Sequence, residues 1–242
     1  MSETYNIQAI VLHRYNFREK DVLVNLYSKE CGRLNLVARG AQKFNSKSAP
    51  HIEPANLINV MVVRGKQFDY LGTAQALKTF SSLKDNYELS ILTQKTLSWL
   101  EGVLLYEDAD ENLFNIIFDF LFTINSKKIS DPELAFYFFI FRVASELGFT
   151  PDLNHCSVCQ CSVDDKKRWY FDFLNQNLKC EKCIQVIRER MIVFNPIISK
   201  ALENFNYNFS GKVFLQKNNR QSFIKFVKNY LKSLPIKTKS LD

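Results

Sequence analysis

The first third of the chain alternates short apolar runs with polar stretches, a pattern that predicts β-strands joined by turns. Five such runs lie between residues 6 and 80, and each is rich in Val, Ile, Leu or Tyr. Their sequences are IQAIVLH, DVLVNLYS, RLNLVAR, NLINVMVVRG and DYLGTAQALKTF. Five strands in this length of chain fit a small antiparallel barrel. We expect an OB-fold, whose open face and loops bind oligonucleotides, although an SH3-like barrel would produce nearly the same pattern.

From residue 87 onward the apolar positions recur at the spacing of amphipathic helices. Two helices are predicted within YELSILTQKTLSWLEGVLL and ENLFNIIFDFLFTI. A third is predicted to begin with Asp131 as its N-cap and Pro132 in its first turn, and to end where Gly148 can adopt the left-handed conformation. Its interior, AFYFFIFRVA, is apolar on most sides, so we expect it to be the buried centre of a helical bundle.

Two or three further helices are predicted towards the C-terminus. Asn195 and Pro196 resemble the cap and first turn of one of them. The last helix, within NNRQSFIKFVKNYLKSLP, should bury one face and expose lysines on the other. The residues predicted to share the buried face are Phe223, Phe226, Val227, Tyr230 and Leu231.

Residues 155–183 read HCSVCQCSVDDKKRWYFDFLNQNLKCEKC and contain five of the six cysteines. Cys156 and Cys159 are two residues apart, as are Cys180 and Cys183, and twenty residues separate the pairs. This spacing predicts one structural zinc ion held by four sulfurs, with a hairpin between the pairs. Four thiolates leave no open position for water, so a catalytic role is not expected. Cys161 could replace either member of the first pair, but its one-residue spacing from Cys159 gives a poorer turn, and we treat it as a bystander.

These patterns together predict an α+β multidomain chain: an N-terminal five-stranded OB-fold barrel, then a helical bundle with an inserted four-cysteine zinc-binding hairpin. Its 242 residues are enough for one large domain or two to three small ones, and 46% are hydrophobic, as in ordinary globular proteins. The predicted parts are an OB-fold nucleic-acid-binding domain at 1–80, a helical domain at 81–154, a zinc-binding module at 155–184, and C-terminal helices at 185–242 that pack on the helical domain.

No catalytic motif is apparent. The chain has three histidines and lacks HExxH, GxSxG, Walker A and GxGxxG sequences. The carboxylates between residues 107 and 111 lie between two predicted helices, where a solvated loop is the simplest interpretation. We therefore expect a protein that is not an enzyme.

The beginning of the chain, MSETYNIQAI, has no basic residue before its first apolar run, unlike a secretory signal. The longest unbroken apolar run, Leu134 to Phe141, is far shorter than the ~20 residues that span a bilayer. We expect a soluble cytoplasmic protein without a membrane segment. In that reducing compartment, clustered cysteines are more often metal ligands than disulfides.

The net charge of +7 is unevenly distributed. Residues 1–80 hold 11 Lys+Arg against 6 Asp+Glu, residues 81–150 hold 5 against 11, and residues 151–242 hold 16 against 8. In the first segment the cations interleave with Tyr15, Phe17, Tyr27 and Phe44, which is what a single-strand binder needs: charges for phosphates and rings for bases. The predicted DNA contacts are Arg14, Arg18, Lys20, Arg33, Arg39, Lys43 and Lys47.

Within this set, Arg33 and Arg39 would share a strand face opposite Leu34 and Leu36 if RLNLVAR is one regular strand. The segment AQKFNSKSAP is the expected contact loop. The basic hairpin residues 166–169 could add a further contact, or form a solvated turn with Trp169 packed inward. Ordinary solvated charge would account for any of these cations equally well.

The order of these parts resembles the RecO family of bacterial recombination mediators. The resemblance lies in AIVLHRYNFREKDVLVNLYSKECGRLNLVARGAQKFNSKS, in FRVASELGFTPDLNHCSVC, and in the second pair CEKC. It spans nearly the whole chain, and its specific anchors are VARGA followed by KS and LGFTP leading into the first pair. The chain departs from the family in having NQNLKCEKC where glycines often precede the second pair, and in the extra Cys161.

The resemblance implies an OB-fold, a helical bundle and a zinc module that act without catalysis in DNA repair and homologous recombination. It implies binding to single- and double-stranded DNA at the nucleoid and annealing of complementary strands. It also implies that the chain works with RecR to load RecA onto DNA coated by single-stranded DNA-binding protein, whose acidic tail family members contact. The family's basic barrel positions match Arg33, Arg39, Lys43 and Lys47.

Two alternatives remain from the residues themselves. A zinc-ribbon adaptor would bind protein partners and touch DNA weakly or not at all. A metal-dependent nuclease would need separated acids brought together in the fold, and the predicted barrel offers few of them.

Overall fold

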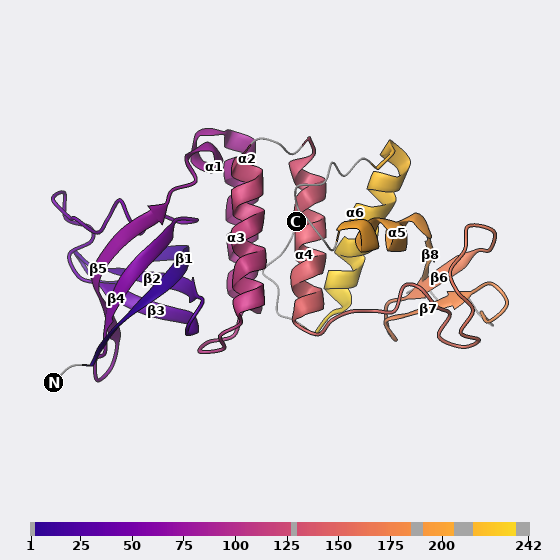
Figure 1. Cartoon of the computed structure of the whole chain (residues 1–242), viewed down its shortest axis with the longest axis horizontal. Helices are drawn as coiled ribbons and strands as arrows, with labels where there is room; N and C mark the ends of the chain where they lie inside the picture. The colour runs from indigo at the N-terminus through magenta and orange to yellow at the C-terminus, as the bar shows by residue number, and fades with distance from the viewer. Residues whose placement is uncertain (1–2, 127–129, 185–190, 206–214, 236–242) are drawn as a thin grey trace. The chain divides into compact units, whose positions relative to one another are not determined.

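The computed structural model describes residues 3–126, 130–184, 191–205 and 215–235 (Figure 1). These residues form two compact units, one ending at Ser126 and the other beginning at Ser130. The four domain ranges expected from the sequence stay a prediction, and part of the range 185–242 lies outside the described residues. Within the described part, no helix combines the length and apolar character needed to cross a bilayer.

Five strands form the barrel of the first unit: β1 (Thr4–Asn16), β2 (Val22–Ser28), β3 (Gly32–Ala38), β4 (Leu57–Val63) and β5 (Asp69–Lys78). Their order is β1-β2-β3-β5-β4, and the barrel closes because β1 pairs with both β2 and β4. The pair β3–β5 is parallel and all other pairs are antiparallel. A closed five-stranded barrel with a crossover between β3 and β5 confirms the predicted OB-fold.

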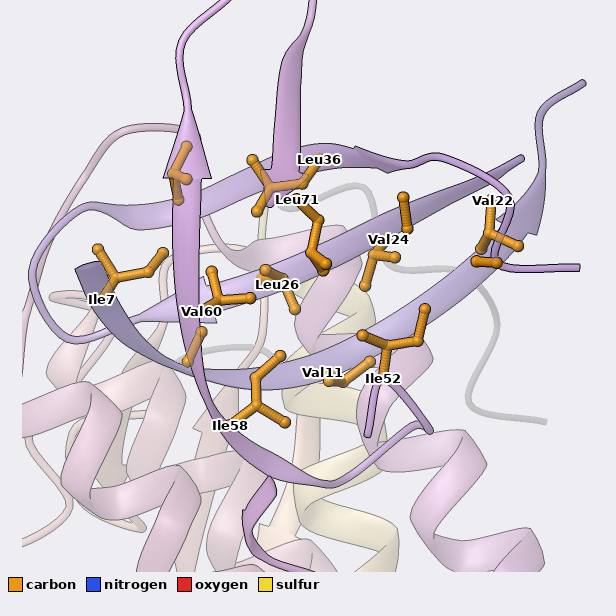
Figure 2. Packing of buried hydrophobic residues seen from close by; sticks show 14 residues of the cluster. Ile7, Val11, Val22, Val24, Leu26, Leu36, Ile52, Ile58, Val60 and Leu71 are labelled. Atoms are coloured by element: carbon orange, nitrogen blue, oxygen red, sulfur yellow. The ribbon is translucent and has the colours of Figure 1, made fainter. Parts of the chain in front are cut away.

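Alternate residues of these strands fill the barrel interior, as the two-residue period of a strand requires. Figure 2 shows Ile7 and Val11 of β1, Val24 and Leu26 of β2 and Val60 of β4 pointing into one apolar cluster. The register of β1 shifts between Val11 and His13, which marks a β-bulge. Ile10 and Leu12, the neighbours of Val11, are also fully buried, so β1 is covered on its outer side as well.

Helices complete the first unit: α1 (Ser81–Asp85), α2 (Tyr87–Val103) and α3 (Glu111–Asn125). The predicted helices correspond to α2 and α3, whereas α1 is a single turn too short for a periodicity to reveal. The side chain of Asn86 accepts a hydrogen bond from the Leu89 amide and that of Asp110 from the Leu113 amide, so both long helices have N-caps. Helix α2 contacts β1 of the barrel.

A buried carboxylate joins α2 to the barrel. Glu101 is 8% exposed and accepts a hydrogen bond from the Tyr15 hydroxyl at 2.7 Å. The guanidinium of Arg33 lies 3.4 Å from the same carboxylate and donates to the backbone oxygens of Glu101 and Leu104. Burial and the bond to Glu101 raise the pKa of Tyr15 to about 12, so its hydroxyl stays protonated and remains a donor. Residues of β1 and β3 are thereby fixed to one turn of α2.

The second unit contains helices α4 (Pro132–Glu146), α5 (Ile197–Phe205) and α6 (Lys217–Ser233). Asp131 caps α4 as predicted, Gly148 follows it with φ of +86°, and most of the helix is buried. The predicted apolar face of α6 is buried, and Phe223 stacks on Phe138 of α4 at 4.1 Å between ring centres. Arg220 of α6 makes a two-pronged ion pair with the Asp131 carboxylate, at 2.5 and 3.1 Å.

A three-stranded sheet in the order β7-β6-β8 completes this unit: β6 (Trp169–Asp172), β7 (Asn177–Cys180) and β8 (Met191–Phe194). The β6–β7 pair is the hairpin expected between the cysteine pairs. The expectation of only helices after the cysteines was wrong for β8. Its sequence MIVF is too short to show a period. It pairs with β6, whose partner residues lie 19 to 25 positions earlier in the chain, a pairing that local patterning cannot reveal.

The Glu101 cluster gives a stability prediction. Glu101→Ala should lower the free energy of unfolding by about 3 kcal/mol, because it leaves the largely buried Arg33 cation without its carboxylate. Urea unfolding followed by circular dichroism measures the change. Glu88→Ala, at an exposed position of the same helix, is the control and should cost less than about 1 kcal/mol. Equal effects of the two substitutions would contradict the role given to Glu101.

Candidate nucleic-acid interface and metal centre

The strand register brings two barrel loops to one end. Asn16 at the end of β1 pairs with Val22 at the start of β2, and Val22 pairs with Ala38 at the end of β3. The β1–β2 loop and the first residues of the β3–β4 loop therefore leave the barrel side by side.

Polar contacts tie these two loops together. The Gly40 amide donates to the Asp21 carboxylate at 2.8 Å, and the Gln42 amide donates to the Lys20 carbonyl at 3.1 Å. The Gln42 side chain donates to the Asp21 carbonyl at 2.9 Å and to the Arg18 carbonyl at 3.4 Å. Gly40 has φ of +64°, a conformation that few other residues adopt readily, and this turn brings Gln42 back over the neighbouring loop. The loops therefore form one surface.

Five of the seven predicted DNA contacts lie on these loops and are exposed. They are Arg18, Lys20, Arg39, Lys43 and Lys47. The Arg39 guanidinium stacks on the Tyr70 ring at 4.0 Å, a geometry that orients the cation and leaves its edge accessible. We call these five residues the basic loop surface.

The β4–β5 loop reaches the same end of the barrel. Phe68 of this loop packs edge-on against Phe17 of the β1–β2 loop at 5.3 Å, and Arg18 lies over the Phe17 ring at 5.0 Å. Lys66 of the same loop is exposed and is not among the predicted DNA contacts. Its place between the fourth and fifth predicted strands was the signal available, since that connection of an OB-fold is a common oligonucleotide contact.

Arg14 and Arg33 are not part of the basic loop surface. Arg14 forms an ion pair with Glu53. The Arg33 side chain is 11% exposed, is held by Glu101, and stacks on Tyr106 at 4.3 Å. Arg33 and Arg39 therefore do not share an open face, because α2 covers the end of β3 at which Arg33 lies. A DNA contact of Arg33 stays a prediction, and these contacts weigh against it.

Two of the four aromatic residues predicted to stack on bases make other contacts. Tyr27 is 1% exposed and cannot reach a base, whereas Tyr15 is 39% exposed and donates its hydroxyl to Glu101. In the cysteine segment, Trp169 is fully buried and its ring nitrogen donates to the Asp164 carbonyl at 2.9 Å. Trp169 is thus packed inward and cannot stack on a base.

The four cysteines predicted to bind metal converge. The sulfur atoms of Cys156, Cys159, Cys180 and Cys183 all lie within 4.8 Å of one another. The Cys180 amide donates to the Cys156 sulfur at 3.4 Å, which links the two pairs. Four close cysteines can hold a metal ion, and an all-sulfur donor set of this kind suits tetrahedral coordination.

The thiols also affect one another's ionisation. Hydrogen bonds from the backbone amide and the side chain of Cys161 lower the pKa of the Cys159 thiol to about 6. Hydrogen bonds with Cys159 and Cys180 raise the pKa of Cys183 to about 12. Once one thiolate has formed, further negative charge in this small space is disfavoured. A divalent cation would remove this repulsion, as expected for a set of metal ligands.

The remaining polar residues of the segment stand outside the four-sulfur cluster. The Cys161 sulfur lies 3.4 Å from that of Cys159 but is not part of the group of four. His155 is exposed, and its ring nitrogen lies 3.3 Å from the Asp152 carboxylate. The geometry therefore selects the predicted set, while the ligand roles themselves stay a prediction.

Comparison with known proteins adds an independent line of evidence. The N-terminal family model of recombination protein O matches residues 1–80, and the C-terminal model matches residues 95–241. A DNA repair protein RecO of Desulforamulus reducens is 28% identical over 165 residues, which cover 67% of this chain and 62% of that protein. Those of Syntrophus aciditrophicus and Listeria monocytogenes are each 23% identical; the matches cover 74% and 76% of this chain and 70% of each relative. The matched segments thus span only about two thirds of these relatives' length.

The cysteine cluster gives a metal prediction. The purified protein should contain one metal ion per chain, and Cys180→Ser should release it and lower the thermal stability, because the remaining ligands bind too weakly. Cys161→Ser is the matched control and should retain the metal. Elemental analysis of each purified variant measures the content. Loss of metal from the Cys161 variant would show that the ligand set is different.

Proposed function

Because the chain belongs to the RecO family, we propose that it acts in DNA repair and homologous recombination by binding DNA and annealing complementary single strands. The observation that carries this proposal is the basic loop surface. Two loops tied by Gln42 and Asp21 hold exposed cations at one end of an OB-fold barrel. Cations so placed replace the counterions of a nucleic-acid backbone, and the released ions favour binding.

In this proposal the phosphate contacts come mainly from the basic loop surface, with Lys66 as an added contact from the β4–β5 loop. Arg14 and Arg33 would have to leave Glu53 and Glu101 to reach a phosphate. Separating Arg33 from the buried carboxylate of Glu101 costs free energy, so the contribution of Arg33 to DNA binding should be small. Both single- and double-stranded DNA carry the phosphates that such a surface attracts.

We propose that the metal of the cysteine cluster is zinc and that its role is structural. Four sulfurs complete a tetrahedral shell and leave no position for a reacting water. The ion would hold the β6–β7 hairpin by joining Cys180, at the end of β7, to the first cysteine pair. The protein would then act without catalysis, as a mediator that positions DNA strands.

We further propose that the chain cooperates with RecR to load RecA onto DNA coated by single-stranded DNA-binding protein, and that it contacts the acidic tail of that protein. Family membership supports these partners, and we assign them to no surface of the chain. The proposed place of action is the cytoplasmic nucleoid, where the DNA substrate is found.

Of the two alternatives, the nuclease has less support. In the described ranges, the four cysteines are the one group of three or more possible metal ligands, and no such group consists of carboxylates. A two-metal hydrolase would need such carboxylates close together. The adaptor alternative differs from the proposal in DNA affinity, which can be measured directly.

The first prediction concerns salt. Binding to a single-stranded oligonucleotide should weaken steeply as the salt concentration rises. The triple variant Arg39→Ala/Lys43→Ala/Lys47→Ala loses three phosphate contacts, so the negative slope of log K against log salt should become less steep by about 2. Fluorescence anisotropy at several salt concentrations measures both effects. The control Lys182→Ala/Lys217→Ala/Lys225→Ala removes the same charge from exposed positions elsewhere and should leave the slope unchanged. A binding constant that does not change with salt concentration would refute the proposed interface.

A second prediction concerns annealing. The wild-type chain should accelerate pairing of complementary strands, both bare and coated by single-stranded DNA-binding protein. The triple variant of the basic loop surface should lose most of this acceleration, because annealing requires that the strands be bound first. A fluorescence-quenching annealing assay measures the rates. If the triple variant anneals as fast as wild type, the barrel loops are not the annealing surface.

A further inference from the structure

The aromatic ring of Phe44 is fully exposed at the tip of the β3–β4 loop. Its relative exposure of 108% is the highest among the large hydrophobic side chains in the described part of the chain. Most apolar rings of this size are at least half buried, as Phe17 and Phe68 are here. A ring that contacts nothing in its own chain is available to a binding partner.

The loop fixes the backbone that carries this ring. Ala41 and Ile52, on either side of the tip, are 2% and 0% exposed and belong to the apolar cluster of the barrel. Between them the Ser46 amide donates to the Lys43 carbonyl at 3.0 Å, so Phe44 occupies the second position of a hydrogen-bonded turn. Binding through Phe44 would therefore cost less conformational entropy than binding through an unstructured loop.

The electrostatic surroundings indicate the kind of partner. Lys43 and Lys47 flank Phe44 in the sequence and are exposed, and the chain has no acidic residue between Glu30 and Glu53. The partner should therefore be anionic and should also present a flat apolar face. An unpaired nucleotide has both properties, since its phosphate is charged and its base has two open faces, whereas the bases of a duplex are stacked on each other.

We propose that Phe44 stacks on an unpaired base of single-stranded nucleic acid and thereby makes the barrel prefer single strands to duplexes. This inference rests on the proposed function, because it assumes that the basic loop surface binds DNA. The lysines beside the ring contact phosphates in either form of DNA, whereas the ring contributes only where a base is free.

The experiment compares three fluorescent probes at one salt concentration: oligo(dT), a duplex of the same length, and a single strand of abasic sugar-phosphate units. Phe44→Ala should weaken binding to oligo(dT) about 5- to 100-fold, the range for loss of one stacked base. Its binding to the duplex and to the abasic strand should equal that of wild type. Phe122→Ala, which removes a partly exposed ring of α3 in the same unit, is the control and should change none of the three.

A second variant reports the contact directly. In Phe44→Trp, indole fluorescence should be quenched by oligo(dT) and not by the abasic strand; the native Trp99 and Trp169 are buried and supply a constant background.

Unchanged oligo(dT) binding by Phe44→Ala would overturn the inference, as would equal weakening on all three probes. If Phe44→Ala lost binding to a protein partner while it still bound oligo(dT) as wild type does, the inference would also be overturned, because the ring would then serve a protein contact. Absence of DNA binding by the wild type would instead refute the proposed function.

Discussion

The pairing of β1 with two strands is the constraint on which the barrel depends. Its first half, from Thr4 to Ile10, pairs with β4, and its second half, from Ala9 to Asn16, pairs with β2. Because a single strand closes the barrel, its register decides which residues face the interior and where each loop leaves. The gathering of cations from two loops at one end is a consequence of this register together with the contacts of Gln42 and Asp21.

Strand β3 and the residue that follows it show how one residue type serves two purposes. Arg33 and Arg39 lie at opposite ends of β3, and in the sequence they look equivalent. Arg33 meets the buried carboxylate of Glu101 and stabilises the attachment of α2, whereas Arg39 rests on an aromatic ring and stays exposed. The difference comes from a helix nearly seventy residues further along the chain. A charge count therefore predicts a basic segment but not which of its cations are available to a ligand.

Much of the fold could be predicted, because its signals are local. Strand alternation revealed the five barrel strands, Asp131 and Gly148 marked the ends of α4, and the two CxxC pairs indicated the cysteine cluster. Features that depend on contacts between distant residues could not be predicted in this way. Strand β8 forms only by pairing with β6, and Arg33 is buried because it pairs with Glu101. The hydrogen bonds that Gln42 makes to the β1–β2 loop could not be predicted either, because a glutamine in a polar loop resembles any other solvated residue.

The position of these hydrogen bonds has a consequence for how such a barrel can change. Gln42 and Asp21 secure the β3–β4 loop at its base, and Ile52 secures its return to the barrel core. The segment between these two anchors can therefore be lengthened, shortened or exchanged while Arg18, Lys20 and Arg39, which lie outside it, keep their places. The two anchors separate a fixed base of the loop from a replaceable segment, so natural or designed variants could acquire new ligand preferences without refolding the barrel.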